Sequence, residues 1–208
     1  MRSKDEEDIL KGHERTVDFA TGNKGKYIEA ADLAGVFGIR MRQLEFDKVE
    51  IQSDDLVQIA SFAAKHAAAT TKRPIVTEDA GFFVDELSGF PGPYSSYVFK
   101  AIGYEGILKL LRGVDNRNAS FRAAVSFCEP KKAPTSFSGI VRGTVSLKPK
   151  GSYGFGFDPI FIPNLGDGRT FAQMTPKEKN LFSHRAKAFA KFFTWFLMKD
   201  SRASAQAE

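Results

Sequence analysis

The first apolar strand of this chain runs directly into a polar turn and then into a helix. The segment TVDFATGNKGK covers residues 16–26 and places a hydroxyl, an amide, two glycines and a lysine in the turn (Thr21, Gly22, Asn23, Gly25 and Lys26). Glycines allow a ligand to come close to the backbone, and the free N–H groups at the start of a helix favour anions. The turn therefore predicts that a phosphorylated ligand binds here.

Neither of the two common phosphate loops matches this turn. GxxxxGK[ST] needs four residues between its glycines, and GxGxxG needs a glycine where this chain has Lys24. A structural alternative is that Gly22 and Asn23 only turn the chain, with Asn23 as the N-cap of the helix. The turn alone leaves both interpretations open.

The composition is that of a globular protein without a membrane span. Of the 208 residues 42% are hydrophobic and 26% are charged, and no apolar run is long enough to cross a bilayer. The charged N-terminal stretch lacks the apolar region of a signal peptide, so a cytoplasmic location is expected. The single cysteine, Cys128, excludes an intrachain disulfide and is predicted to fill the core.

The positive charge does not identify a partner. The net charge is +5, but lysines and arginines are spread over the whole sequence rather than gathered in one block. Most phenylalanines stand at core-like spacing, which favours a core over a stacking platform for nucleic acid. No membrane and no stable nucleic-acid partner is therefore expected.

Strands and helices alternate through the first half. The helix after the turn is predicted to end at Gly38, and a strand follows near residues 39–46. Ser53 or Asp54 is the predicted cap of a second helix, which runs to Thr71, and the short apolar run PIVTED is then a buried strand. This β-α-β-α-β order predicts an α/β protein with a partly parallel sheet.

The second half mixes short helices with antiparallel strands. Two short helices fit the spacing of residues 98–111, and residues 119–128 and 135–147 alternate as a pair of strands. Thr175 before Pro176, and Ser183, are predicted helix caps.

The two ends of the chain are polar and aperiodic. Residues 1–14 and 200–208 are therefore expected to be disordered tails around a single domain at residues 15–199.

An acidic pair follows the buried strand PIVT. Glu78 and Asp79 stand at its predicted carboxyl end, where open α/β sheets place their ligands. Beside a phosphate site such oxygens can hold Mg²⁺, and one carboxylate can activate water. Glu50 can complete the metal site, although Asp47, Asp54 and Asp55 compete for that part. A solvated turn is the structural alternative.

Two phenylalanines flank a glycine in GSYGFGFDPIF. A base can stack on Phe155 or Phe157 while Asp158 accepts hydrogen bonds from ring N–H groups. In the alternative, both rings pack inward from a glycine-rich turn.

Three polar donors surround one helix start in PKEKNLFSHRAKA. Arg185 can donate to a carbonyl oxygen of a base, Lys179 can reach phosphate, and His184 lies between them in sequence. The alternative is an ordinary basic helix face.

Taken in order, these segments resemble the inosine triphosphate pyrophosphatase family, which hydrolyses non-standard purine nucleoside triphosphates such as ITP, dITP and XTP. The resemblance covers roughly residues 16–198, through TGNKGKYIEA, VTEDAGFFVDELSGFPGPYSSYV, GFGFDPIF, TFAQM and EKNLFSHRAKA. It implies an elongated mixed α/β sheet with helices on both faces and two lobes around a central nucleotide cleft. It also implies a homodimer that releases pyrophosphate with Mg²⁺ and thereby cleans the nucleotide pool.

The resemblance implies roles for individual residues. Asp79 matches the proton acceptor and metal ligand, and Glu50 matches the second metal ligand. The implied phosphate-side contacts are Thr21, Gly22, Asn23, Lys24, Gly25, Lys26 and Lys179, and Ala80 is a further implied substrate contact. The implied base-side contacts are Phe155, Gly156, Phe157, Asp158, His184 and Arg185. An arginine that donates to a 6-oxo group would reject a 6-amino group, because two donors would face each other.

Two positions depart from the family pattern. Ala80 stands where a serine or threonine commonly follows the aspartate, so only a backbone contact is left there. Phe157 replaces a common tyrosine or tryptophan and loses a polar group.

Two other functions stay open from the sequence. One is a nucleotide or nucleic-acid binding protein without hydrolysis. The other is a pyrophosphatase for modified pyrimidine triphosphates, which resembles neither the SHR nor the GFGFDP segment.

Overall fold

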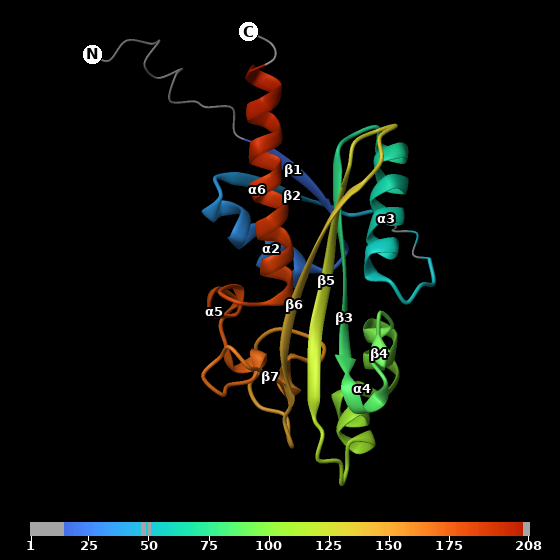
Figure 1. Cartoon of the computed structure of the whole chain (residues 1–208), viewed down its shortest axis with the longest axis vertical. Coiled ribbons are helices and arrows are strands. Elements are labelled where there is room, and N and C mark those ends of the chain that lie inside the picture. The colour runs from blue at the N-terminus through green and yellow to red at the C-terminus, as the bar shows by residue number, and fades with distance from the viewer. Residues whose placement is uncertain (1–14, 47–48, 50, 206–208) are drawn as a thin grey trace, which may run out of the picture.

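The computed structural model describes residues 15–46, 49 and 51–205 of the chain. Within these residues one seven-stranded sheet runs along an elongated molecule (Figure 1). The strands follow the order β2-β1-β3-β5-β6-β7, and β4 pairs with β3. The predicted tail at residues 1–14 and the predicted metal ligand Glu50 lie outside the described residues.

The first half has the predicted β-α-β-α-β order. Its elements are β1 (Arg15–Ala20), α2 (Lys24–Val36), β2 (Ile39–Leu44), α3 (Leu56–Thr71) and β3 (Ile75–Val84). Strand β1 pairs in parallel with both β2 and β3, so the partly parallel sheet is confirmed. Helix α2 is followed by Gly38 at a φ of +66°, as its predicted end requires.

The cap of α3 differs from the prediction. The Asp55 carboxylate accepts a hydrogen bond from the Val57 N–H at 2.8 Å and is the N-cap, rather than Ser53 or Asp54. The Ser53 hydroxyl instead accepts a bond from the Asp55 N–H at 3.1 Å. Neighbouring polar residues compete for one cap, and the local turn decides between them.

Strand β3 does not end at the acidic pair. It continues through Glu78 and Asp79 to Val84 and pairs antiparallel with β5 (Asn118–Cys128) from Ile75 onward. A Cβ at Gly81 would collide with the Gly92 carbonyl, so this glycine allows β4 (Pro91–Gly92) to cross closely rather than turning the chain. The predicted strand exit is therefore wrong, and the two carboxylates lie in mid-strand.

The remaining elements complete the second half. They are η1 (Asp85–Leu87), α4 (Ser95–Leu110), β6 (Thr135–Val145), η2 (Asp158–Ile160), β7 (Phe161–Pro163), η3 (Phe171–Gln173), α5 (Pro176–Asn180) and α6 (His184–Ala205). Helix α4 is broken at Gly103, which agrees with two short helices. Strands β5 and β6 form the predicted antiparallel pair.

Both predicted caps around α5 and α6 are present. Thr175 and Glu178 form a reciprocal capping box at the start of α5. The Ser183 hydroxyl accepts a bond from the Ala186 N–H at 3.1 Å at the start of α6. Helix α6 then continues to Ala205, so residues 200–205 are helical rather than the predicted disordered tail.

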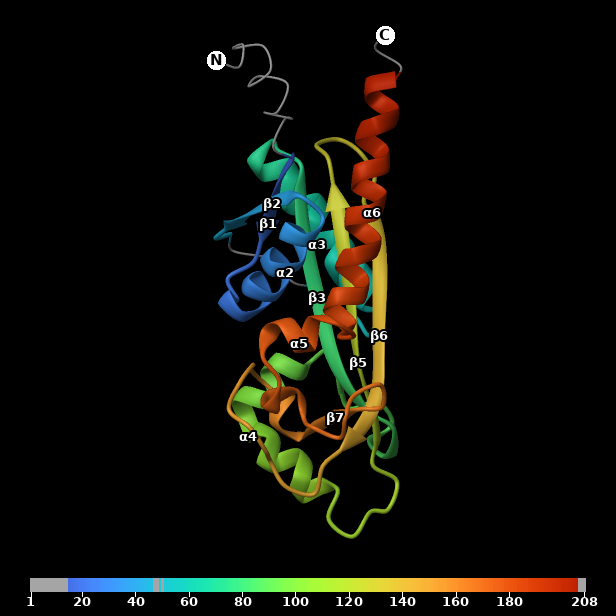
Figure 2. The ribbon, with the colours of Figure 1, turned by 90° about the vertical axis from the view of Figure 1, so that its left-hand side faces the viewer.

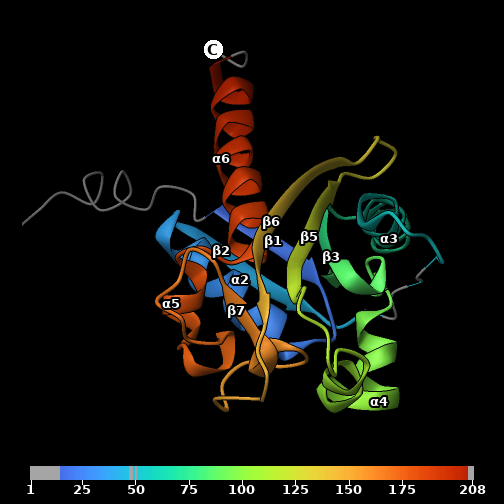
Figure 3. The same ribbon diagram turned by 60° about the horizontal axis from the view of Figure 1, so that its bottom comes forward.

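Helices cover both faces of the sheet, as predicted. Helices α2 and α6 lie on one face, and α3 lies on the other (Figure 3). Phe189, Phe192 and Phe193 of α6 pack on Phe19 of β1 in the first core. Cys128 is buried with alanines of α3, in agreement with its predicted place.

A second core divides the molecule into two lobes. Helix α4 and strand β7 gather at the end of the sheet away from the C-terminal half of α6 (Figure 2). The rings of Phe82, Phe121, Phe157, Phe161 and Phe171 fill this lower lobe. No helix in the described part of the chain is long and apolar enough to span a membrane.

The contact between β6 and the start of α6 depends on the glycine at position 139. A Cβ at Gly139 would collide with the His184 carbonyl and lie 2.7 Å from the Ala188 nitrogen. We expect Gly139→Ala to lower the free energy of unfolding by about 1–3 kcal/mol, because α6 must move away from the sheet. Urea unfolding measures the change. Gly35→Ala on α2, where a Cβ has no neighbour within 4 Å, is the control and should stabilise the protein by about 0.4–1 kcal/mol.

Candidate active site

A cavity of about 470 Å³ lies between the two lobes. It brings together segments that are far apart in the sequence, among them the turn after β1, the middle of β3, the start of α4, the loop before η2, α5 and the start of α6. The predicted site residues that line it are Thr21, Gly22, Asn23, Lys26, Asp79, Ala80, Phe155, Gly156, Phe157, Asp158, Lys179, His184 and Arg185. Most of the predicted site is therefore one connected surface.

The turn after β1 has the structural role that its sequence predicts, and it also lines the cavity. Asn23 is the N-cap of α2, since its side-chain oxygen accepts a bond from the Lys26 N–H at 3.0 Å, and its own N–H donates to the Thr21 hydroxyl at 3.2 Å. The turn nevertheless lines the cavity with its hydroxyl, amide and lysine side chains. Lys24 and Gly25 do not line it. A Cβ at Gly25 would lie 2.6 Å from the Phe155 ring, so this glycine makes room for the ring.

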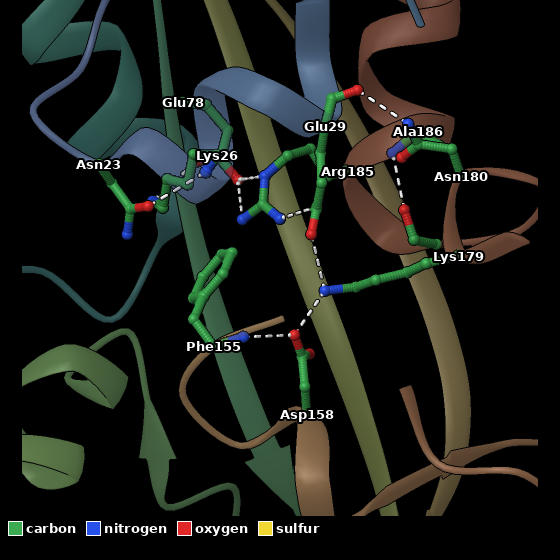
Figure 4. A network of polar contacts seen from close by, with 11 residues as sticks. Asn23, Lys26, Glu29, Glu78, Phe155, Asp158, Lys179, Asn180, Arg185 and Ala186 are labelled. Atoms are coloured by element: carbon green, nitrogen blue, oxygen red, sulfur yellow. Dashed lines mark hydrogen bonds and ion pairs between the residues drawn. The ribbon is translucent and has the colours of Figure 1, made fainter. Parts of the chain in front are cut away.

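Six charged side chains of alternating sign run from this turn to the opposite wall (Figure 4). At the first end, the Lys26 ammonium lies 2.7 Å from Glu78 Oε2. The other Glu78 oxygen, Oε1, accepts a hydrogen bond from Arg185 Nε at 3.1 Å and lies 3.1 Å from Arg185 Nη2. Glu78 thus joins a cation of the turn to a cation of α6.

The series continues through a carboxylate that sequence reasoning missed. Glu29 on α2 receives Arg185 Nη1 at 2.5 Å and the Lys179 ammonium at 2.8 Å. The same ammonium lies 2.7 Å from Asp158 Oδ2, which also accepts from the Phe155 N–H at 3.0 Å. The available sequence signal was the spacing of Glu29, three residues after Lys26, which places both on one side of α2.

Burial and pairing set the protonation of this cluster. Burial opposes the charge of Arg185, but the carboxylates of Glu78 and Glu29 outweigh it and raise the pKa of Arg185. Burial works against ionised Glu29 as well, yet Arg185 and Lys179 lower the pKa of Glu29 overall. Burial raises the pKa of Asp158, with Lys179 opposing that effect. The guanidinium is therefore a permanent, fixed charge.

Lys179 lies on a different side of the cavity from the one predicted. Its ammonium is held by Glu29 and Asp158, and it lies 5.2 Å from the centroid of the Phe155 ring. The side chain is 3% exposed. The structure thus groups Lys179 with the GFGFDP loop rather than with the turn after β1 (Figure 4).

Aromatic rings surround the other polar groups. His184 stacks on Phe121 with 4.8 Å between ring centroids, and its Nδ1 atom is buried without a hydrogen-bond partner in the described structure. Phe157 packs inward against Phe82 and Phe99, as the structural alternative held, although it also lines the cavity. Five further residues that were not predicted from the sequence also line the cavity: Ser95, Ser96, Phe99, Lys100 and Phe121.

Asp79 is the more exposed of the two neighbouring carboxylates of β3. It lines the cavity from mid-strand and is 9% exposed. Glu78 lines the cavity too, but both of its oxygens contact cations. No cluster of three or more His, Cys, Asp or Glu side chains that could hold a metal occurs in the described part of the chain.

Together these features define an α/β protein with a cleft that has hydroxyl, amide and lysine side chains at one end and aromatic rings with fixed hydrogen-bond donors at the other. The chain belongs to the Ham1 family, whose model matches residues 17–195. The resemblance drawn from the sequence is thereby confirmed.

Curated relatives and solved structures agree with this membership. The chain is 48% identical over 178 residues to a dITP/XTP pyrophosphatase of Methanopyrus kandleri. The alignment covers 86% of this chain and 94% of the relative. It is 49% identical over 172 residues to one of Saccharolobus solfataricus, with 83% and 88% covered. A HAM1 protein from Coxiella burnetii superposes with a TM-score of 0.76 at 30% identity, over 88% of this chain and 99% of that one.

The buried charges make Lys179 important for stability. Lys179→Met removes the cation between Glu29 and Asp158, and we expect a loss of about 3–5 kcal/mol in the free energy of unfolding. Lys177→Met on the same helix is the matched control, because Lys177 is exposed, and should change stability by less than about 0.5 kcal/mol. Urea unfolding of the two variants compares them directly. Equal free energies of unfolding for the two variants would contradict a stabilising role of the ion pairs of Lys179.

His184 should make stability depend on pH. Burial, followed by the charges of Arg185 and Lys179, lowers the pKa of His184 well below 6.5. As the pH falls below about 6.5, the unfolded chain takes up a proton that the folded protein does not, so stability falls by up to about 1.4 kcal/mol per pH unit. Urea unfolding at pH 7.5, 6.5 and 5.5 measures this. His184→Gln should flatten the dependence, and an unchanged slope would show that another group causes it.

Proposed function

We propose that this chain hydrolyses the triphosphates of non-canonical purine nucleosides, such as dITP and XTP, to the monophosphate and pyrophosphate. The observation that carries the proposal is the cavity itself. It joins a turn suited to phosphates to a guanidinium that two buried carboxylates hold beside aromatic rings. The name dITP/XTP pyrophosphatase, which curated relatives bear, supports the same reaction.

Arg185 provides the selection of the base. Its nitrogens contact Glu78 and Glu29, and a guanidinium has five N–H groups, so further donors are left for a ligand. A 6-oxo group accepts such a bond, whereas a 6-amino group presents a second donor and is rejected. The neutral imidazole of His184 adds one donor and one acceptor on the same wall. Phe155 offers a ring face on which a base can stack.

The phosphate end provides charge and positioning. The turn of Thr21, Gly22 and Asn23 offers a hydroxyl, backbone N–H groups and an amide to the phosphates, and Lys26 stabilises charge on the pyrophosphate that leaves. The Ala80 backbone supplies the contact that a side chain would otherwise make there. Lys179 acts on the base side, through its bond to Asp158.

Asp79 activates the water molecule. The water oxygen forms a bond to the α-phosphorus while the bond from that phosphorus to the pyrophosphate oxygen breaks, and Asp79 accepts the proton. Glu78 is less suited to this step, since both of its oxygens contact cations.

Mg²⁺ fits the carboxylates of this site. Asp79 offers hard oxygen ligands on the cavity wall, and Mg²⁺ commonly takes only one or two carboxylates together with substrate phosphates. Asp79 would hold the ion, with Glu50 as the proposed second ligand. When bound, the ion neutralises negative charge on the triphosphate.

Other properties stay predictions. A homodimer and a cytoplasmic location are consistent with an enzyme of nucleotide pools. The membership in the Ham1 family argues against the rival that acts on modified pyrimidine triphosphates. A binding protein without hydrolysis is the rival that an assay must address.

The reaction and its carboxylate can be tested together. Wild-type protein, Asp79→Asn and the exposed control Asp32→Asn are each given ITP, XTP, ATP, GTP or dUTP with Mg²⁺, and pyrophosphate release is measured. We expect release from ITP and XTP, a loss of at least about 100-fold in turnover for Asp79→Asn, and no loss for Asp32→Asn.

Two results would contradict the proposal in different ways. Near wild-type turnover by Asp79→Asn would exclude this residue as the base. If no triphosphate released pyrophosphate while ITP still bound, the chain would be a binding protein.

A further inference from the structure

The Glu78 carboxylate contacts one cation from each end of the cavity. Its side chain is fully buried in mid-strand of β3. Oxygen Oε2 holds Lys26 of the phosphate turn at 2.7 Å, and Oε1 holds Arg185 of the base wall at 3.1 Å. One carboxylate therefore links the two cations (Figure 4).

The two cations differ in how firmly they are held. Arg185 has a second carboxylate partner, Glu29, and a side chain that is 2% exposed. The Lys26 side chain is 17% exposed and lines the cavity. A ligand with phosphate groups can therefore reach Lys26, and it competes there with Glu78 for the same ammonium.

We infer that Glu78 is a positioning residue that couples phosphate binding to base recognition. In the empty cleft Glu78 shares its charge between Lys26 and Arg185. When a polyphosphate takes Lys26, that ammonium no longer competes for Glu78, and the contact between Glu78 and Arg185 holds the guanidinium more firmly for the base. The inference rests on the proposed function for the identity of the substrate.

This role predicts opposite effects on the two ends of the cavity. Glu78→Gln removes the competitor for Lys26, so we expect inorganic tripolyphosphate to bind about tenfold more tightly. The same change removes one of the two carboxylates that orient Arg185, so we expect the preference for ITP over ATP to fall by about tenfold or more. A defect in folding alone would weaken both the binding of tripolyphosphate and the preference for ITP.

The experiment uses equilibrium binding without added metal, measured by calorimetry. The ligands are tripolyphosphate, ITP and ATP, and the proteins are wild type, Glu78→Gln, Lys26→Met and the double variant. The gain in tripolyphosphate affinity should vanish when Lys26 is absent, because the gain arises from freeing that lysine. Asp32→Asn, which removes an exposed carboxylate from α2, controls for the change in net charge and should alter neither property.

Three results would overturn the coupling. One is weaker binding of tripolyphosphate by Glu78→Gln, the second is a gain that persists in the Lys26→Met background, and the third is an unchanged ITP preference. If Glu78→Gln does not fold, Glu78→Asp keeps the charge but is too short to reach both cations. It should tighten tripolyphosphate binding or lower the ITP preference, and a variant that does neither overturns the inference.

Failure of the coupling and failure of the proposed function are distinguishable. Binding does not require hydrolysis, so the predicted pattern without pyrophosphate release would leave the coupling in place and exclude the enzyme. If ITP released pyrophosphate but the predicted changes in binding were absent, the proposed enzyme would stand and the coupling would be excluded.

Discussion

The structure depends on a buried series of ion pairs that crosses its centre. Removing charged groups from water costs several kcal/mol for each ion, and only close pairing with complementary partners offsets this cost. Each carboxylate of the series, Glu78, Glu29 and Asp158, contacts at least one cation at 3.1 Å or less. Apolar residues of similar volume would commonly be as stable. The ion pairs are better explained by what they position, which is the guanidinium of Arg185 and the ammonium of Lys179 at fixed points of the cavity wall.

Positioning these groups requires that several elements meet within a few ångströms. Strand β3 brings Glu78, helix α2 brings Glu29, and the start of α6 brings Arg185. The close approach of α6 to β6 at Gly139 sets where α6 begins, and the Ser183 cap defines its first turn. Packing in the first core and hydrogen bonding at the cavity therefore constrain the same helix, α6. A shift of α6 would disturb the aromatic core and the site together.

The sequence predicted correctly those features that interactions between residues close in sequence determine. Helix caps at Asn23 and Thr175 follow from side chains that bond to the backbone within three residues, so their prediction was correct. Strand order in the first half followed from the β-α-β-α-β pattern. The continuation of β3 past Asp79 was missed, because it depends on pairing with β5, about forty residues later in the chain. The partners of Lys179 were missed for the same reason, since Glu29 lies 150 residues away in sequence.

Charge balance explains why a polyphosphate is expected to bind more tightly when a cation besides those of the protein is present. Among the described residues that line the cavity or pair with its lining, the cations are Lys26, Lys100, Lys179 and Arg185, and the carboxylates are Glu29, Glu78, Asp79 and Asp158. Their formal charges cancel. Two of the cations, Lys179 and Arg185, are already held by carboxylates on the base side. A triphosphate would bring several negative charges to the cavity that Asp79 lines, and a divalent ion held by Asp79 would offset their repulsion. The same balance that fixes Arg185 on the cavity wall thus makes metal dependence an expected property of the proposed reaction.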